Sequence, residues 1–480
     1  MAQNSKRWWV LICVGVITFM SDLDASIVNV ALPVINRSLH ITMSLSELLI
    51  SVYLVVICVC LLPFGKLGDS VGKIKIFKIG MVVFTLGSLL CGISTAFGML
   101  LTARAIQAVG AAMTMSTNNG IITETFSTGE RGQALGWIGS FVALGMIAGP
   151  GVGGVILNSF PWEAIFWINV PIGVAMVILG LIVLPRNKTM QVTQFDGLGT
   201  ILVSVGIIGV FTYLYGGRQF GYANAALLVF LVAALLAIVG FVGYERHTST
   251  PSIDLSIFKS FHFSVGVGTA ILIFIANNFY MVLTPFYLEN ARHLGPNIAG
   301  YMMMALPLVQ VIIAPIYGRL SDRFGALKIS VVGLGIILVT QVLFAHVTLQ
   351  TMLVSYCSFI GLLGLGNAIF QSPNNAMIMG AVPSNQLGIA GSVNALARNL
   401  GMVLGNALAT SLLFVFMSHL TNAHITNFTG AHVAAYLTGQ QWIYWLGSAL
   451  VLVAVGISLA RNLIKRQSAS HDLGCTRSNG

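Results

Sequence analysis

The sequence predicts an all-helical polytopic membrane protein with fourteen transmembrane helices: two six-helix bundles in a parallel pseudo-repeat, plus two inserted central helices. Three observations predict this fold. Only 8% of the 480 residues are charged, whereas about 25% is usual in soluble domains. A mean hydropathy of +0.91 means more apolar side chain than a water-facing surface could hide. A charged hairpin motif also occurs twice, once in each half of the chain and in the same direction.

Fourteen apolar segments are separated by charges, prolines and glycine clusters. Each is long enough to cross a bilayer, which takes about 20 residues of helix. An even number of crossings places both termini on the same side of the membrane. The segments run near residues 8–35, 47–64, 76–95, 98–123, 133–157, 163–185, 196–216, 223–243, 262–288, 297–317, 328–347, 351–379, 387–418 and 438–461.

The basic residues indicate which side the termini occupy. Most of the 23 lysines and arginines lie in loops on the side of the termini, among them Lys6, Lys73, Arg319 and Lys465. By the positive-inside rule, both termini are expected in the cytoplasm and the protein in the cell membrane, surrounded by the lipid bilayer. Because topology accounts for the net charge of +10, no nucleic-acid partner is expected.

The internal repeat explains the number of helices. Gly65 to Ile76 recurs as Gly318 to Ile329, and Ser116 to Asn119 recurs as Ser372 to Asn375. If six helices fill each repeat, about 75 residues remain between the repeats, which is enough for two more helices. The predicted domains are an N-terminal six-helix bundle at 1–188, two inserted helices at 189–260, a C-terminal six-helix bundle at 261–462 and a cytoplasmic tail at 463–480.

Two opposite charges lie inside predicted spans at similar depth. By the rise of a helix, Asp24 lies about 24 Å from the cytoplasmic end of the first span, and Arg104 about 9 Å from the outer end of the fourth. A charge inside a membrane is costly, so it indicates a functional site. A carboxylate beside a fixed arginine and a cavity can bind and release a proton; the alternative is a permanent structural ion pair.

Four other polar residues within spans are candidates for proton coupling or substrate binding. Asp22 and Asp24 point about 200° apart on a helix, so they cannot share a partner, and Asp22 is left open between a direct role and contact with another helix. Arg398 is expected near the middle of the membrane, where it can contact a partner or a substrate. Gln107 and Asn277 are candidate pocket residues, with hydrogen bonds between packed helices as the alternative.

No nucleotide or metal site is indicated by the sequence. The chain has no Gly-x-x-x-x-Gly-Lys-Ser/Thr phosphate loop, and its six cysteines form no metal-binding pair. Gly149 to Gly154 matches a dinucleotide-binding pattern, but it lies inside a predicted span and follows no strand. Neither enzymatic activity nor a cofactor is therefore expected, and a proton or other ion gradient remains as the energy source.

Five segments resemble one family of membrane proteins. Leu23 to Pro33 resembles the first-span signature of the fourteen-span drug/proton antiporters of the QacA/EmrB type, a branch of the major facilitator superfamily. In that superfamily one helical bundle rocks against the other, so that a central site opens to each side in turn. Gly65 to Lys75 resembles motif A, Arg104 to Gly110 resembles motif B, Gly145 to Gly154 resembles motif C, and Phe166 to Gly173 also fits this branch.

The resemblance implies roles for the matching residues. Asp24 and Arg104 would belong to a proton-coupling or cation-recognition site. Asp69 would help close a cytoplasmic gate by meeting a helix N-terminus in the other half, where a carboxylate is stabilised. The alternative for Asp69 is an ordinary hairpin turn.

Further gating residues are expected in both copies of the hairpin. Gly65 and Gly72 would allow close approach of the helices. Because Ser70 stands where motif A usually has arginine, the gate is expected to depend more on Asp322 and Arg323 in the second copy.

Motif C has its own mechanics. Gly145, Gly149 and Gly153 recur every four residues, so they form a smooth stripe along which helices pack closely. Pro150 is expected to bend this helix, and Gly154 completes the motif. Ordinary packing of small residues is the alternative.

These features together predict a proton-coupled antiporter that exports amphipathic or cationic drugs across the membrane as a monomer, as in multidrug efflux and antibiotic resistance. Its partners would be small amphipathic or cationic substrates and protons. One alternative is a dedicated exporter of a single metabolite or antibiotic, such as an amino acid, a tetracycline-like compound or a siderophore. Another is a membrane sensor or scaffold that does not transport.

Overall fold

The computed structural model describes the chain except for residues 1, 42, 186–195, 249–254, 423–431 and 478–480. Within the described residues, all regular secondary structure is helical. Fourteen helical stretches in this part of the chain are long and apolar enough to cross a membrane. The predicted fold class and number of spans are therefore confirmed.

The helices follow the predicted segments in order. The N-terminal half consists of α1 (Ala2–Ser38), α2 (Met43–Val71), α3 (Lys73–Gly92), α4 (Phe97–Thr125), α5 (Arg131–Ser159), α6 (Ala164–Trp167) and α7 (Asn169–Val183). The inserted pair is α8 (Gly197–Phe220) and α9 (Ala225–Glu245). The C-terminal half consists of η1 (Leu255–Lys259), α10 (Phe261–Pro285), η2 (Phe286–Ala291), α11 (Pro296–Met303), α12 (Ala305–Phe324), α13 (Ala326–Ala345), α14 (Leu353–Gly380), η3 (Ser384–Gln386), α15 (Leu387–Thr421) and α16 (Val433–Arg477).

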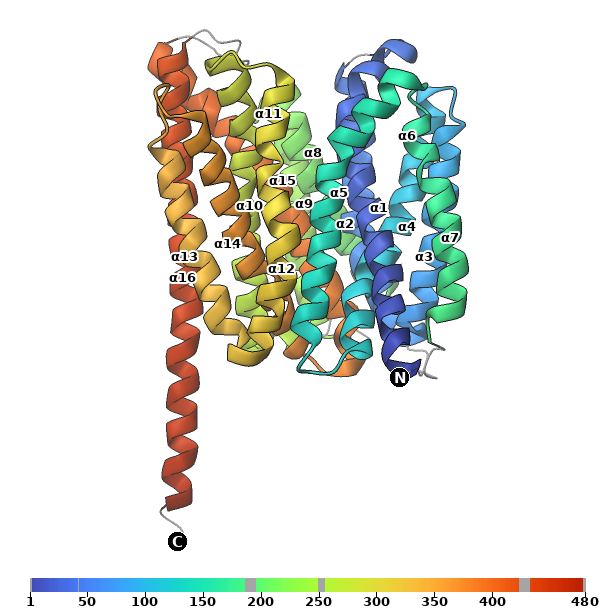
Figure 1. Cartoon of the computed structure of the whole chain (residues 1–480), viewed down its shortest axis with the longest axis vertical. Helices are drawn as coiled ribbons and strands as arrows, with labels where there is room; N and C mark the ends of the chain where they lie inside the picture. Colours follow the sequence, from blue (N-terminus) through green and yellow to red (C-terminus); the bar gives the residue numbers. More distant parts are fainter. Residues whose placement is uncertain (1, 42, 186–195, 249–254, 423–431, 478–480) are drawn as a thin grey trace.

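The two halves stand side by side and have equivalent internal packing (Figure 1). In the N-terminal half α1 packs against α5 and α3 against α4, while in the C-terminal half α10 packs against α15 and α13 against α14. The halves meet where α5 contacts α12 and α2 contacts α15. The inserted helices α8 and α9 pack against each other, and α8 also contacts α2 and α15. Both chain ends point to the same end of the molecule in Figure 1.

Glycines allow α5 and α15 to lie very close to their partner helices. A Cβ atom on Gly149 would lie 1.8 Å from Oγ of Ser26, and one on Gly145 would lie 2.7 Å from a carbonyl oxygen of α1. In the other half, a Cβ on Gly405 would lie 2.6 Å from the carbonyl oxygen of Ile275. Helices this close exclude any larger side chain at these positions.

The other residues of motif C differ in how closely they pack against neighbouring helices. Gly153 also faces α1, since its added Cβ would lie 2.8 Å from a side-chain carbon of Ile27. Gly154 has open space around it, with no atom within 4 Å of an added Cβ. Pro150 lies inside α5, which continues through it as one helix. The smooth stripe therefore comprises Gly145, Gly149 and Gly153 without Gly154.

The repeated hairpin is mostly helical. α2 and α12 continue past the predicted ends at residues 64 and 317, by about two turns each. Each stops before a glycine with positive φ, which is 113° at Gly72 and 93° at Gly325. Asp69 and Asp322 therefore stand on the last turn of a long helix, which fixes the direction of each carboxylate.

Other predicted boundaries are shifted or interrupted. The span predicted at 163–185 is divided into α6 and α7, and the span predicted at 297–317 into α11 and α12. The predicted tail at 463–480 continues α16, which is helical to Arg477, so no break in helix marks its start. The domain boundary predicted at 188 lies outside the described residues.

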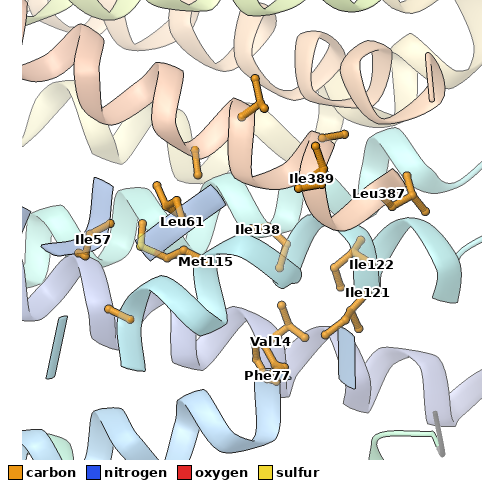
Figure 2. Packing of buried hydrophobic residues seen from close by; sticks show 14 of the residues in the cluster. Val14, Ile57, Leu61, Phe77, Met115, Ile121, Ile122, Ile138, Leu387 and Ile389 are labelled. Carbon is orange, nitrogen blue, oxygen red and sulfur yellow. The ribbon is translucent and has the colours of Figure 1, made fainter. Parts of the chain in front are cut away.

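The apolar core crosses the interface between the halves. One buried cluster includes Ile121 and Ile122 of α4 and Ile138 of α5 together with Leu387 and Ile389 of α15 (Figure 2). These residues lie near the ends of α4 and α5 that approach the start of α15. Close packing of these side chains therefore joins the two halves here, in addition to the polar contacts described below.

Candidate functional site

The predicted charges of the first and fourth spans form one buried ion pair. Nη1 of Arg104 on α4 contacts Oδ2 of Asp24 on α1, and both side chains are fully buried. Oδ1 of Asp24 accepts hydrogen bonds from Nε2 of Gln107 at 2.8 Å and from Nδ2 of Asn169 at 3.2 Å. Both oxygens of the carboxylate are thus occupied by donors from α4 and α7.

The guanidinium of Arg104 is equally well held. Its Nη1 also donates to Oε1 of Gln107 at 2.6 Å, and its Nε donates to the carbonyl oxygen of Leu49 at 3.4 Å. Its central carbon lies 4.2 Å from the centre of the Tyr53 ring, which is a cation–π contact. The network ties α1, α2, α4 and α7 together around one charge pair.

Part of this network was not predicted from the sequence. Asn169, Tyr53 and Ser88 all belong to it, Ser88 by accepting a hydrogen bond from Nε2 of Gln107 at 2.8 Å. Asn169 lies in the Phe166 to Gly173 segment that carries the family resemblance, and this was a usable signal. The other two are ordinary residues of apolar spans, and only the packing identifies them.

Asp22 faces a different direction from Asp24. An added Cβ on Gly145 of α5 would lie 3.0 Å from Cβ of Asp22, so this side chain lies against α5. Its Oδ2 is shielded from solvent and has no hydrogen-bond partner among the described residues. Arg398 of α15, in the other half, lines a cavity that also contacts Thr18, one helical turn before Asp22.

A small cavity lies between the halves, and on α1 it is lined by Thr18, one helical turn before Asp22. Its volume is about 50 Å³, and one water molecule needs about 10–15 Å³ of such space. It therefore has room for a few water molecules and must widen to hold a larger compound. The lining residues are Thr18, Met115, Asn118, Asn119, Ile138, Gly139, Val142, Phe274, Gln371, Asn375, Asn394, Ala395 and Arg398.

The cavity lining is polar and includes a single charged side chain, that of Arg398. Of the predicted binding residues, Arg398 is in the lining and Gln107 and Asn277 are not. Gln107 belongs to the Asp24 network, and Nδ2 of Asn277 donates to Oδ1 of Asn367 at 2.7 Å within the C-terminal half. The amides at Asn119 and Asn375 occupy equivalent places in the repeat, which was the signal available in the sequence.

The first hairpin contacts the other half through Asp69. Its two carboxylate oxygens accept hydrogen bonds from the backbone N–H groups of Gly388 and Ile389, both at 2.8 Å, at the start of α15. Nζ of Lys73 lies 3.0 Å from Oδ1 of Asp69 and 2.9 Å from Oε1 of Glu124. A carboxylate at a helix N-terminus is stabilised by the free N–H groups and the helix dipole.

The second hairpin makes the symmetry-related contact. Oδ1 and Oδ2 of Asp322 accept hydrogen bonds from the N–H groups of Gly132 at 2.9 Å and Gln133 at 3.1 Å, at the start of α5. Arg323 is exposed and lies over the Phe324 ring, 5.6 Å from its centre. The interface therefore uses Asp69 and Asp322 alike, whereas Arg323 faces away from it.

Glycines are required at the two contacts that Asp69 and Asp322 make between the halves, which we call the latches. An added Cβ on Gly65 would lie 2.0 Å from Oγ of Ser392, and one on Gly318 would lie 2.2 Å from the carbonyl oxygen of Gly132. Both contacts join one half to the other. The two hairpins therefore close the interface at the ends of α2 and α12, on the side where the N-terminus lies (Figure 1).

A family model described as the Major Facilitator Superfamily matches residues 14–253 and 265–471. The riboflavin transporter RibZ of Clostridioides difficile (strain 630) is 35% identical over 453 residues, covering 94% of this chain and 96% of that protein. The multidrug resistance protein Stp of Mycobacterium tuberculosis (strain CDC 1551 / Oshkosh) is 29% identical, covering 88% of this chain and 79% of its own. The tetracenomycin C resistance and export protein of Streptomyces glaucescens is 30% identical, covering 86% and 77%.

Two solved structures share the fold at low sequence identity. The human organic anion transporter MFSD10 (TETRAN) has a TM-score of 0.61 and 15% identity, covering 93% of this chain and 99% of that chain. The proton:xylose symporter XylE has a TM-score of 0.63 and 13% identity, covering 94% and 95%. At this identity the likeness concerns the fold alone.

Proposed function

This chain belongs to the major facilitator superfamily, and we propose that it is a proton-coupled antiporter that exports amphipathic compounds from the cytoplasm by alternating access. In this proposal it works as a monomer in the cell membrane, with both termini in the cytoplasm. A carboxylate on α1 is its proton site. The family and the multi-pass architecture are the premises; the proton coupling, the direction and the substrate are the proposal.

The observation that carries the proposal is a pair of polar bridges that join the two halves at the end of the molecule where the N-terminus lies. Asp69 and Asp322 each bridge from one half to a helix N-terminus in the other, on the side of the N-terminus. These bridges are hydrogen bonds and small-residue contacts, which can break and re-form as one half rocks. Breakable bridges at one end of the interface, beside a central cavity, suit alternating access.

The composition of the cavity supports a substrate with many hydrogen-bonding groups. Five side-chain amides, those of Asn118, Asn119, Gln371, Asn375 and Asn394, line it together with Arg398. Side-chain amides both donate and accept hydrogen bonds, so they suit neutral polar compounds. The positive charge of Arg398 disfavours permanent cations, so within the amphipathic class we favour neutral or anionic members over cationic ones.

A second candidate is transport of riboflavin or a related planar, hydrogen-bonding compound. The specific observation in its favour is the 35% identity to the riboflavin transporter of Clostridioides difficile (strain 630) over nearly the full length of both chains. The uncharged amides of the cavity fit such a compound as well. This candidate uses the same scaffold and the same coupling site.

Transport in inverted membrane vesicles tests the proposal, with riboflavin and ethidium as two fluorescent probes and a proton gradient imposed across the membrane. Uptake of either probe that follows the gradient supports proton-coupled export. Riboflavin alone would favour the dedicated transporter, whereas both probes would indicate broad export. If neither probe responds to the gradient, proton-coupled export of these two classes is wrong.

A further inference from the structure

The two aspartates of α1 differ in whether they can exchange a proton. Both oxygens of Asp24 are already occupied, by Arg104, Gln107 and Asn169. Protonation of Asp24 would leave the guanidinium of Arg104 fully buried without a counter-charge, which is strongly unfavourable. Asp24 is therefore suited to remain ionised and to hold four helices together.

Asp22 has the opposite properties. Its Oδ2 is shielded from solvent and has no hydrogen-bond partner in the described part of the chain. A proton can bind this oxygen without displacing any hydrogen bond of the protein. The side chain lies against Gly145, where the lack of a Cβ lets α1 and α5 approach closely.

Asp22 lies about one helical turn from two residues that line the cavity, although it is not itself part of the lining. Thr18, one helical turn earlier on α1, lines the cavity, and residues four apart lie on the same face of a helix. On α5, Val142 lines the cavity and Gly145 contacts Asp22 one turn further along. The cavity has room for a few water molecules, which can carry a proton to or from Asp22 when the halves move.

The charged and titratable groups that act on Asp22 come from three directions. Arg398 of α15 lines the same cavity as Thr18 and interacts electrostatically with Asp22, and Tyr53 of α2 is a neighbouring titratable group. α5 presents Gly145, which has no charge. On α4, Arg104 is committed to Asp24 on the other side of α1. Arg398 is thus the cation available to Asp22, and it belongs to the half that moves relative to α1.

We propose that Asp22 carries the coupled proton and that Arg398 drives the release of this proton when the halves bring the two side chains together. A nearby cation favours the ionised carboxylate. When the cation is distant, burial of the carboxylate favours the protonated form. An O–H bond forms at Asp22 with a proton from water on one side and breaks to return the proton to water on the other side. Asp24 and Arg104 position α1 and take no part in the proton exchange.

This inference rests on the proposed proton coupling, so it is tested in the same vesicles with riboflavin and ethidium. In Asp22→Asn, gradient-driven accumulation should fall to the level without a gradient, while exchange of labelled for unlabelled probe should fall less than about threefold. Glu289→Gln, the same loss of charge at the outer end of η2, is the control and should retain gradient-driven accumulation. If wild type ignores the gradient, the proposed function fails; if wild type responds and Asp22→Asn responds equally, only this inference fails.

A second measurement needs no transported probe. Infrared difference spectra of the reconstituted protein between high and low pH should contain the carbonyl stretch of a protonated carboxylic acid. The band should disappear in Asp22→Asn and shift in frequency in Asp22→Glu, while Asp24→Asn should retain it. In Arg398→Gln, the pH midpoint of the band should rise by about one unit or more, and Arg398→Lys should restore most of the wild-type value. A band lost in Asp24→Asn and kept in Asp22→Asn would overturn the assignment.

Discussion

The two halves of the molecule share one packing scheme but differ in charge. Asn277 lies as far before Gly318 as Asp24 lies before Gly65, so the two occupy equivalent places in the repeat. In the N-terminal half this position holds a carboxylate paired with Arg104. In the C-terminal half it holds an amide, which bonds to another amide.

The same contrast recurs at the two hairpins. Asp69 and Asp322 contact equivalent helix N-termini, but Asp69 also has Lys73 as an ionic partner, whereas Ala326 stands at the equivalent place in the second copy. The shared scaffold needs only the glycines, the apolar faces and the two capping carboxylates. At these positions the N-terminal half therefore has ion pairs where the C-terminal half has neutral residues.

The largest expected effect comes from removing the charges of the buried Asp24–Arg104 pair in the N-terminal half, one residue at a time. Asp24→Asn or Arg104→Gln alone should lower the free energy of unfolding by about 3–5 kcal/mol, because each leaves one buried charge without its partner. The double variant should recover a large part of that loss, since it imitates the neutral amide pair of the other half. Thermal unfolding of the detergent-purified variants measures all three.

The matched control is Asn277→Ala, which removes a neutral hydrogen bond in the C-terminal half and should cost about 1 kcal/mol. Losses that simply add in the double variant would show that Asp24 and Arg104 are not coupled, contrary to the geometry described above.

An intermediate effect is expected at the two latches. Replacing a capping carboxylate with alanine costs about 1 kcal/mol, which corresponds to about a fivefold shift in a two-state equilibrium. Asp322→Ala should therefore increase opening of the N-terminal side about fivefold. Asp69→Ala should increase it more, because Lys73 also loses an ionic partner. The measurement is the rate at which a membrane-impermeant maleimide, added on that side, labels a cysteine placed at Gln371 in an otherwise cysteine-free protein.

Arg323→Ala is the control for the latches, since Arg323 is exposed and faces away from the interface. Its labelling rate should equal that of the parent protein. A rate as high as that of Asp322→Ala would restore the expectation that Arg323 belongs to the gate.

The smallest expected effect concerns the residues that precede α5 and α15. Hydrogen bonds from Ser127 and Arg7 lower the pKa of Glu130, while Gln386 precedes α15 at the equivalent place and does not titrate. The ionised pair with Arg7 should stabilise the fold fully above the ordinary glutamate pKa, and this stability should be lost as the pH falls through the lowered value. The pair is partly exposed, so the change should stay within about 1 kcal/mol.

Unfolding of wild type and Glu130→Gln, compared from neutral pH to about pH 3, checks this expectation. The stability difference between the two should shrink on acidification. A difference that stays constant over this range would mean that the ion pair contributes nothing.

Several features could be predicted because they depend on local sequence. Hydropathy identified fourteen spans, and the repeated hairpin indicated two equivalent bundles with an insertion between them. The pairing of Asp24 with Arg104 could be anticipated, because helical rise placed both at similar depth. The extension of α2 to Val71 was missed, since charged residues at a membrane surface look like a loop but can continue a helix beyond the apolar region.

The sequence by itself determined that this protein spans a membrane, the number of its spans and its internal repeat, because apolar length and repeated motifs are properties of the chain alone. Only the tertiary structure decided that Asp24 is enclosed by donors from two other helices, while Asp22 faces α5 with one oxygen that has no partner among the described residues. Two residues apart on one helix, these carboxylates point to different neighbours. What each can do is set by side chains distant in the sequence, which only the packing of the helices brings beside them.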